Sequence, residues 1–316
     1  MIRSIVFVSL LCCLVPAEAK QKINKPKKEL SGVVYDFKKF NIEEIRDDIK
    51  NGKISNTYNT LPLGTVIKNL EKIIDVEPKG DYETNNDFEK RKIDAFSRKI
   101  IGDISANDLM IFSLSVENFK NYSSSSVRFN YDADDSKLSI YVFPETKTLS
   151  NIGAPDYMYS FGTELKGLDL FEIDMELNNL GEYTGANAFG RTVDVTKSQL
   201  ITYGIATNHI DSIKNNRSYY YSNDEKYESF VDLSIDTKNA KDFVSDLAAM
   251  AVFRPKYPYL YFHFDSIKPT IEKPKETYYN YKYIYGDILY IVIYLKKTGE
   301  ILKVLSNENS SIGNVQ

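Results

Sequence analysis

The sequence predicts an α+β protein in which a helical amino-terminal part is followed by a mostly antiparallel β-sheet with one amphipathic helix at 236–249. Two observations lead to this prediction. Up to residue 105, apolar residues recur at intervals of three and four, which is the period of a buried helix face. Beyond it they alternate with polar residues, which is the period of a strand with one buried face. Because short turns separate many of these later segments, we expect neighbouring strands to pair antiparallel.

The amino terminus has the pattern of a secretory signal peptide. Arg3 supplies a positive charge and is followed by an apolar run that Pro16 ends. The next residues, Ala17 to Ala19, form a small-x-small cleavage site. The apolar run is shorter than the roughly 20 residues that a bilayer-spanning helix needs. We therefore expect cleavage after Ala19 and a mature protein that is periplasmic or secreted.

After the signal peptide at 1–19, we expect four further regions. They are a flexible basic leader at 20–30, a helix-rich region at 31–105, a β-rich α+β domain at 106–305 and a flexible tail at 306–316. The leader and the tail contain few apolar residues that could be buried in a core, which favours disorder in both.

The cysteines and the charge balance narrow the class of protein. Cys12 and Cys13 are the only cysteines, and cleavage of the signal peptide removes both. Many small secreted domains of eukaryotes depend on disulfides, so a cysteine-free mature chain favours a bacterial envelope or secreted protein. The net charge of −4 is small and lacks the basic excess of a nucleic-acid-binding protein. Since no later apolar stretch is long enough for a transmembrane helix, we expect no transmembrane segment in the mature chain.

Three helices are expected in the helix-rich region. The first begins at Asn41, which suits an N-cap, and ends near Gly52, which suits the left-handed position after a helix. The second begins near Pro62. The third is expected over 86–101, with Glu89 as the acidic residue of its first turn. The apolar residues expected to face inward are Ile42, Ile45, Ile49, Leu63, Val66, Ile67, Leu70, Ile73, Ile74, Ile93, Phe96 and Ile100.

Alternating and β-branched segments predict the strands of the β-rich domain. They are 110–116, 127–131, 137–143, 169–177, 188–195, 199–205, 230–235, 259–264, 278–285, 288–295 and 301–304. The helix at 236–249 interrupts this series. Asp236 is expected to cap it, and Ala240, Phe243, Val244 and Leu247 are expected to form its buried face.

A glycine-rich string resembles the spacing of a phosphate-binding loop. Gly185 and Gly190 have the required separation, but Arg191 stands where such a loop needs lysine. The loop works because a helix follows it and holds the phosphates at its amino terminus. Here the pattern from Val193 onward is that of a strand, so we interpret the string as a connection between strands.

Asp132, Asp134 and Asp135 suggest a calcium loop, but the glycine and the glutamate that an EF-hand needs are absent. Aspartate is also common in tight turns, because its carboxylate accepts nearby backbone hydrogen bonds. We therefore expect a turn between two strands, with an irregular surface calcium site as the alternative. No motif indicates a cofactor, and we expect none.

Few residues suit catalysis. The mature chain has only two histidines, His209 and His263, and no HExxH or GxSxG string. His209 lies in a polar segment. His263 and Asp265 share one face of a predicted strand, but no serine nucleophile can be assigned to them.

Tyrosine is the most unusual feature of the composition, with 24 tyrosines and no tryptophan. Alternation along two predicted strands gives two tyrosine stripes. If the strands are neighbours, the stripes merge into an aromatic platform suited to sugars or extended peptides. The alternative is that these tyrosines pack in the core. The candidate binding residues are Tyr259, Tyr261, His263, Asp265, Tyr279, Tyr281 and Tyr283.

Three classes of function remain. The absence of a catalytic signature favours an extracytoplasmic binding or interaction protein whose partner is a glycan, a peptide or a protein of the envelope. One alternative is an envelope hydrolase that uses carboxylates or His263. The other is a structural subunit of a surface or secretion assembly, which would pair through a β edge or the tyrosine face.

Overall fold

The structure, a computed structural model, describes residues 36–55, 58–74, 79–119, 126–147, 168–186, 189–208, 210 and 229–307. The signal peptide, the basic leader, His209 and most of the tail lie outside these residues.

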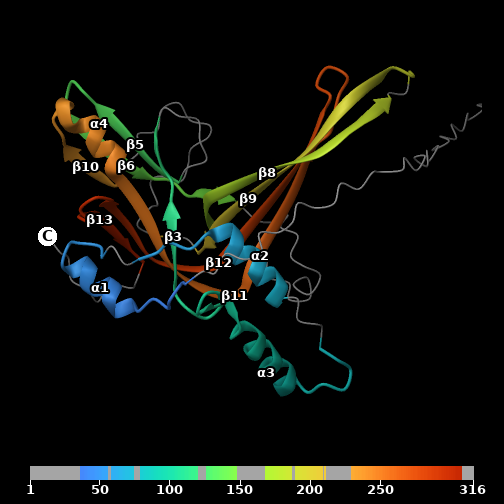
Figure 1. The fold of residues 1–316 in the computed structure, drawn as a ribbon, viewed down its shortest axis with the longest axis horizontal. Helices are drawn as coiled ribbons and strands as arrows, with labels where there is room; N and C mark the ends of the chain where they lie inside the picture. Colours follow the sequence, from blue (N-terminus) through green and yellow to red (C-terminus); the bar gives the residue numbers. More distant parts are fainter. Residues whose placement is uncertain are drawn as a thin grey trace, which may run out of the picture. The chain divides into compact units, whose positions relative to one another are not determined.

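The described part is an α+β fold built mostly of strands (Figure 1). Its helices are α1 Ile42–Lys50, α2 Leu63–Ile74, α3 Asn85–Phe96 and α4 Thr237–Asp246. Its strands are β1 Lys99–Ile101, β2 Ile104–Ser105, β3 Met110–Leu114, β4 Val116–Asn118, β5 Val127–Asp132, β6 Lys137–Val142, β7 Glu145–Lys147, β8 Leu168–Ala186, β9 Thr192–Thr207, β10 Val231–Ser234, β11 Leu247–Ile267, β12 Lys275–Leu295 and β13 Ile301–Ser306.

The larger sheets mix parallel and antiparallel pairs, whereas the sequence analysis expects mostly antiparallel pairing between neighbouring strands. The largest sheet has the order β3-β11-β12-β9-β8-β7, with β13 also pairing with β12. In it, β8 with β9 and β11 with β12 form two antiparallel hairpins. The hairpins join through their second strands, β9 and β12, which run in the same direction and therefore pair in parallel. A four-stranded sheet, β10-β6-β5-β4, also contains one parallel pair, β4 with β5.

Helices α1 and α2 begin where the sequence predicts them. The side chain of Asn41 accepts a hydrogen bond from the backbone N–H of Glu43 at 3.1 Å, so it caps α1. Gly52 follows α1 with φ at 67°, the left-handed conformation that glycine tolerates best. Helix α2 begins at Leu63, directly after the predicted Pro62.

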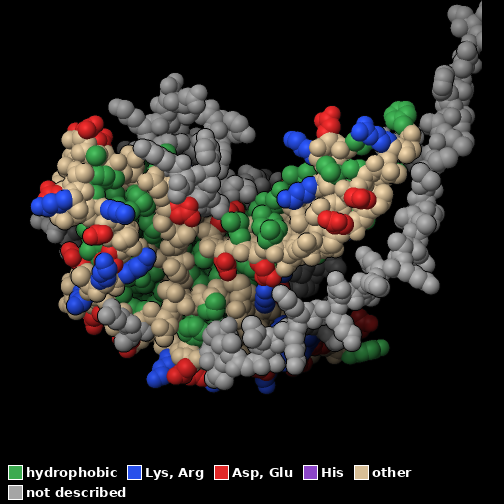
Figure 2. Space-filling model, turned by 45° about the horizontal axis from the view of Figure 1, so that its top comes forward, with side chains coloured by type: hydrophobic (Ala, Val, Ile, Leu, Met, Phe, Trp, Pro, Cys, Tyr) green, Lys and Arg blue, Asp and Glu red, His purple; other side chains and the backbone are tan. Residues whose placement is uncertain are grey.

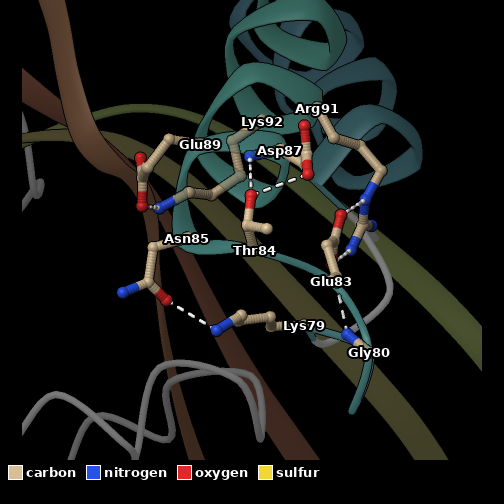
Figure 3. A network of polar contacts seen from close by, with 9 residues as sticks. All are labelled: Lys79, Gly80, Glu83, Thr84, Asn85, Asp87, Glu89, Arg91 and Lys92. Atoms are coloured by element: carbon tan, nitrogen blue, oxygen red, sulfur yellow. Dashed lines mark hydrogen bonds and ion pairs between the residues drawn. The ribbon is translucent and has the colours of Figure 1, made fainter.

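Helix α3 differs from the prediction at its amino terminus (Figure 3). Thr84 is the N-cap: its hydroxyl oxygen accepts a hydrogen bond from the N–H of Asp87 at 3.1 Å and donates one to the Asp87 carboxylate at 2.6 Å. Asp87 therefore takes the role expected of Glu89, because threonine offers a hydroxyl cap two residues before the predicted start. Glu89 forms an ion pair with Lys92 instead, at 2.6 Å.

The carboxy-terminal end of α3 also differs. The helix ends at Phe96, and residues 99–101, predicted as helix, form β1. Phe96 and Ile100 are buried as predicted, but Ile93 is exposed. The pairing of β1 with β2 offers the β-branched residues Ile100 and Ile101 a buried strand, which they favour over a helix.

The predicted helix at 236–249 is too long. Helix α4 ends at Asp246, and Leu247 begins β11. Asp236 occupies the N-cap position, but its side chain makes no capping hydrogen bond. Residues 249–253 pair with β12 on one side and β3 on the other, and this double pairing outweighs the helix preference of Ala248 and Ala249.

Several predicted strands are parts of longer ones. The segments 188–195 and 199–205 belong to β9 from Thr192 onward, and 278–285 and 288–295 belong to β12. The glycine-rich string joins β8 to β9, and a strand rather than a helix follows it. The turn at Asp132 is confirmed, since its carboxylate accepts hydrogen bonds from the N–H groups of Asp134 and Asp135 at 3.0 and 3.3 Å.

Helix α2 shares the main core with the large sheet. Its buried face packs against residues of β9, β11 and β12, and the apolar residues that it contributes are Leu63, Val66, Ile67 and Leu70. Two ion pairs reinforce this packing: Lys68 with Glu176 of β8 at 2.7 Å, and Glu71 with Lys282 of β12 at 2.6 Å. Among the described residues, none of the helices has both the length and the apolar character that crossing a membrane requires.

Candidate functional site

The two tyrosine stripes lie next to each other on one face of the large sheet. Residues paired directly across neighbouring strands point to the same face. The register places Tyr261 opposite Tyr283, His263 opposite Tyr281, and Asp265 opposite Tyr279. We call this side of the sheet the tyrosine face. Sequence alternation anticipated both stripes except at Tyr259, and the pairing of β11 with β12 brings them together.

Strands β9 and β8 extend the tyrosine face with residues that the sequence analysis did not single out. Their pairing continues the rows that β11 and β12 begin. One row reads His263, Tyr281, Thr202 and Met175, and the next reads Asp265, Tyr279, Leu200 and Leu177. The alternation of Met175 and Leu177 with acidic residues is the signal that could have identified them.

One end of the tyrosine face is buried, which corrects part of the predicted platform. Tyr261 and Tyr283 are buried in a small core with Tyr285. The rings of Tyr261 and Tyr285 meet edge to face at 5.4 Å. Burial also raises the pKa of the Tyr261 hydroxyl. Tyr261 and Tyr283 are therefore packing residues, because this end of the sheet is covered within the protein. The other members of the small core are Leu168, Leu170 and Ala206.

Tyr259 is a second correction, because it does not share a face with Tyr261. A bulge lies between Pro255 and Leu260, and Tyr259 has φ at 69°. This irregularity breaks the alternation of side chains, and Tyr259 joins the main core on the other side of the sheet. Its ring packs on Phe96 at 4.5 Å, and its hydroxyl donates a hydrogen bond to the Asn107 side chain at 3.0 Å.

The other end of the tyrosine face is accessible. Tyr279 and Tyr281 are partly exposed and stack with their ring centres 6.5 Å apart. Met175, Leu177 and Ile267, on the flanking strands, are 57 %, 70 % and 56 % exposed. We call the following residues the exposed tyrosine face: Met175, Leu177, His263, Asp265, Ile267, Tyr279 and Tyr281. Figure 2 shows hydrophobic side chains at the surface over β8 and β9, which are labelled in Figure 1.

His263 and Asp265 make structural contacts at this end. The His263 ring packs on Tyr281 at 5.6 Å. Asp265 is exposed, and its carboxylate accepts a hydrogen bond from the N–H of Ser266 at 2.7 Å. In the described part of the chain, no group of three or more His, Cys, Asp or Glu side chains is placed to hold a metal ion.

On the opposite face, close to the loop that joins β11 to β12, lies the buried carboxylate of Glu276, which has several polar partners. Glu276 is buried and accepts hydrogen bonds from the hydroxyls of Tyr278 at 2.8 Å and Tyr183 at 3.2 Å. Lys268 lies 3.7 Å from the same carboxylate. The hydrogen bond from Tyr278 is the main cause that holds the pKa of Glu276 below its usual value. Leu260 and Phe262, on the same side of β11, lie in or against the main core, whereas Phe264 is 60 % exposed.

Oxidative footprinting of the folded protein tests this division of the tyrosine face. We expect hydroxyl radicals to modify Tyr279 and Tyr281 readily and to spare Tyr261 and Tyr283, since modification follows exposure. Tyr82, which is fully exposed in the loop before α3, provides the reference for an unprotected ring. Equal protection of all four face tyrosines, read by mass spectrometry, would show that the whole face is covered.

Comparison with known proteins gives no match, whether to a family model, a curated protein or a solved structure. The function is therefore inferred from the geometry of the tyrosine face.

Proposed function

We propose that this chain is an exported binding protein that contacts its partner through the exposed tyrosine face. One observation carries the proposal. Met175, Leu177 and Ile267 are each more than half exposed and lie on the same face as the stacked pair Tyr279 and Tyr281. Exposed apolar side chains that gather on one face of a protein mark interaction sites.

The residue types suit recognition. Tyrosine presents a large rigid ring with a hydroxyl at its tip, so it contributes contact area at little cost in side-chain entropy. Methionine adapts its shape to a partner, because its side chain is unbranched and flexible. Asp265 and His263, at the border of the same face, supply polar groups. A glycan, a peptide or a protein surface fits this combination.

Export is the second part of the proposal. It rests on the signal-peptide pattern of residues 1–19 and on the cleavage site that ends at Ala19. Sequencing of the amino terminus of the protein recovered from its producing cells tests it. A mature terminus at Lys20 supports export, and an intact Met1 contradicts it.

The binding face is tested with glycan and peptide arrays. We expect the purified protein to bind a subset of array members, and the double variant Tyr279→Ser, Tyr281→Ser to lose about tenfold or more in affinity. Tyr82→Ser is the matched control, since it removes an exposed tyrosine far from this face in sequence and should bind as the wild type does. Circular dichroism checks that all variants fold. Unchanged binding by the double variant would contradict the proposal.

A further inference from the structure

The outer edge of β11 has two parts. Over Ala249–Phe253 this edge pairs with β3, the last strand of the sheet order. Beyond the bulge at 255–260, no further pairing to this edge is present in the described residues, while the other edge of β11 continues along β12. Strand β3 therefore pairs only with the first half of β11. Along the second half, from Leu260 onward, no strand of the described residues takes the corresponding place.

The opposite edge of the sheet, along β8, is protected against pairing. Its register with β9 is broken by irregularities between Glu172 and Asp174 and between Asn179 and Gly181. Side chains also take up backbone donors there. Asp174 accepts a hydrogen bond from the N–H of Met175 at 2.9 Å, and Asn179 accepts one from the N–H of Gly181 at 2.8 Å. Bulges and charged residues are the devices that keep edge strands from pairing with other chains.

The β11 edge is regular where the β8 edge is broken. Its register with β12 runs without a shift from Leu260 opposite Ile284 to Ile267 opposite Thr277. The N–H of Ile288 in β12 bonds to Thr207 of β9, so the N–H and C=O groups of the even-numbered residues of β12 point away from β11. The register pairs these residues with the even-numbered residues of β11, so the N–H and C=O groups of Phe262 and Phe264 point outward, away from β12. At the end of this stretch, the N–H of Ser266 donates a hydrogen bond to the Asp265 side chain. The bulge ends this regular edge on one side and the Asp265 cap ends it on the other, which leaves a window at 260–264.

We propose that an extended segment of a partner protein binds by adding a strand to β11 at residues 260–264. This inference rests on the proposed function and names its partner class. The outward N–H and C=O groups of an edge strand complement the backbone of another extended chain. Alternate side chains of the added strand would lie beside His263 and Asp265 on the tyrosine face, and the others beside Phe262 and Phe264. The partner segment therefore carries apolar or aromatic residues at alternate positions.

The short window favours a flexible segment over a second copy of this chain. In an antiparallel pair of two β11 edges centred on Phe262, residues 265–267 of one copy would lie opposite the bulge of the other. Pro255 and Pro258 in this bulge offer no N–H for pairing. A segment of about five residues fits within the window, whereas the longer β11 strand of a second copy would extend past it and meet the bulge.

The test uses peptides selected from a phage-displayed library of random 12-residue sequences against the purified protein. An enriched peptide is synthesised with single N-methyl groups, which each remove one backbone donor. We expect methylation at alternate residues to weaken binding by about tenfold, and methylation at the residues between them to have little effect. This period of two is the signature of strand addition. Failure to enrich any peptide, or binding that is indifferent to N-methylation, overturns the inference.

Two protein variants provide the matched comparison. Phe264→Lys places a charge beside the β11 window, and we expect it to weaken peptide binding. Leu180→Lys places the same charge on the β8 edge at a residue that is also exposed, and we expect it to leave binding unchanged. Equal effects of the two variants overturn the assignment to β11.

The outcomes separate this inference from the proposed function. Peptides that depend on Tyr279 and Tyr281 but tolerate every N-methyl group support the tyrosine face and refute strand addition. Selective binding of glycans without binding of peptides likewise supports the tyrosine face and refutes strand addition. Concentration-dependent self-association that Phe264→Lys abolishes identifies a second copy as the occupant, and so refutes the partner segment. Strand addition is supported if the alternating sensitivity to N-methylation is lost in Phe264→Lys and retained in Leu180→Lys.

Discussion

Replacing Phe253 by alanine is expected to lower the free energy of unfolding by about 3–5 kcal/mol, the usual cost of removing a buried phenylalanine. Phe253 is fully buried in β11, where it pairs with Met110 of β3 and Ile288 of β12. Its ring packs against Phe112 at 6.0 Å. The variant loses this apolar burial and leaves a cavity between the sheet and the elements that cover it. Urea denaturation followed by circular dichroism measures the loss.

Phe264→Ala is the matched control for this prediction. It makes the same chemical change in the same strand, but Phe264 is 60 % exposed. We expect its free energy of unfolding to stay within about 0.5 kcal/mol of the wild-type value, as for most surface substitutions. Similar losses in the two variants would mean that Phe253 is not a core residue, or that Phe264 is covered in solution.

Gly204→Ala is expected to cost about 1–3 kcal/mol, the range for a group forced into a filled space. Gly204 lies in β9, opposite Tyr283 of β12 and Glu172 of β8. A Cβ atom there would lie 2.6 Å from the backbone oxygen of Phe171 and 2.7 Å from the Tyr283 ring. The absence of a side chain at Gly204 is therefore what lets the Tyr283 ring lie over β9 and bury this end of the tyrosine face.

Two measurements check the role of Gly204. Urea denaturation gives the loss of stability, and oxidative footprinting of the variant should show increased modification of Tyr283, because its ring has to move. Gly80→Ala is the control, since a Cβ atom there meets only Glu83, at an ordinary 3.8 Å. We expect its stability to change by no more than about 0.5 kcal/mol. A Gly204→Ala protein as stable as Gly80→Ala, with Tyr283 still protected, would contradict the prediction.

Local signals predicted much of the secondary structure. Asn41 caps α1, the apolar residues of α2 spaced by three and four face the core, and Asp132 stabilises the turn between β5 and β6. These features were predictable because each depends on residues within a few positions of one another. The tyrosine stripes likewise follow from alternation along one strand. Boundaries were less predictable. The end of α4 at Asp246 depends on β3 and β12, which pair with the next residues from far along the chain.

By itself, therefore, the sequence determined the helical and strand periods, the turn at Asp132 and, away from the bulge before Leu260, which residues share a face within a strand. The tertiary structure alone decided that β8 pairs with β9, that β11 pairs with β12, and that these two hairpins join in parallel through β9 and β12. This pairing places Met175 and Leu177 in line with Tyr279 and Tyr281. The tertiary structure also decided that the tyrosine face is buried at Tyr283 and accessible at Tyr279. Alternation reports only the side of a strand to which a side chain points. What covers that side is set by contacts between segments distant in sequence, and no local pattern encodes them.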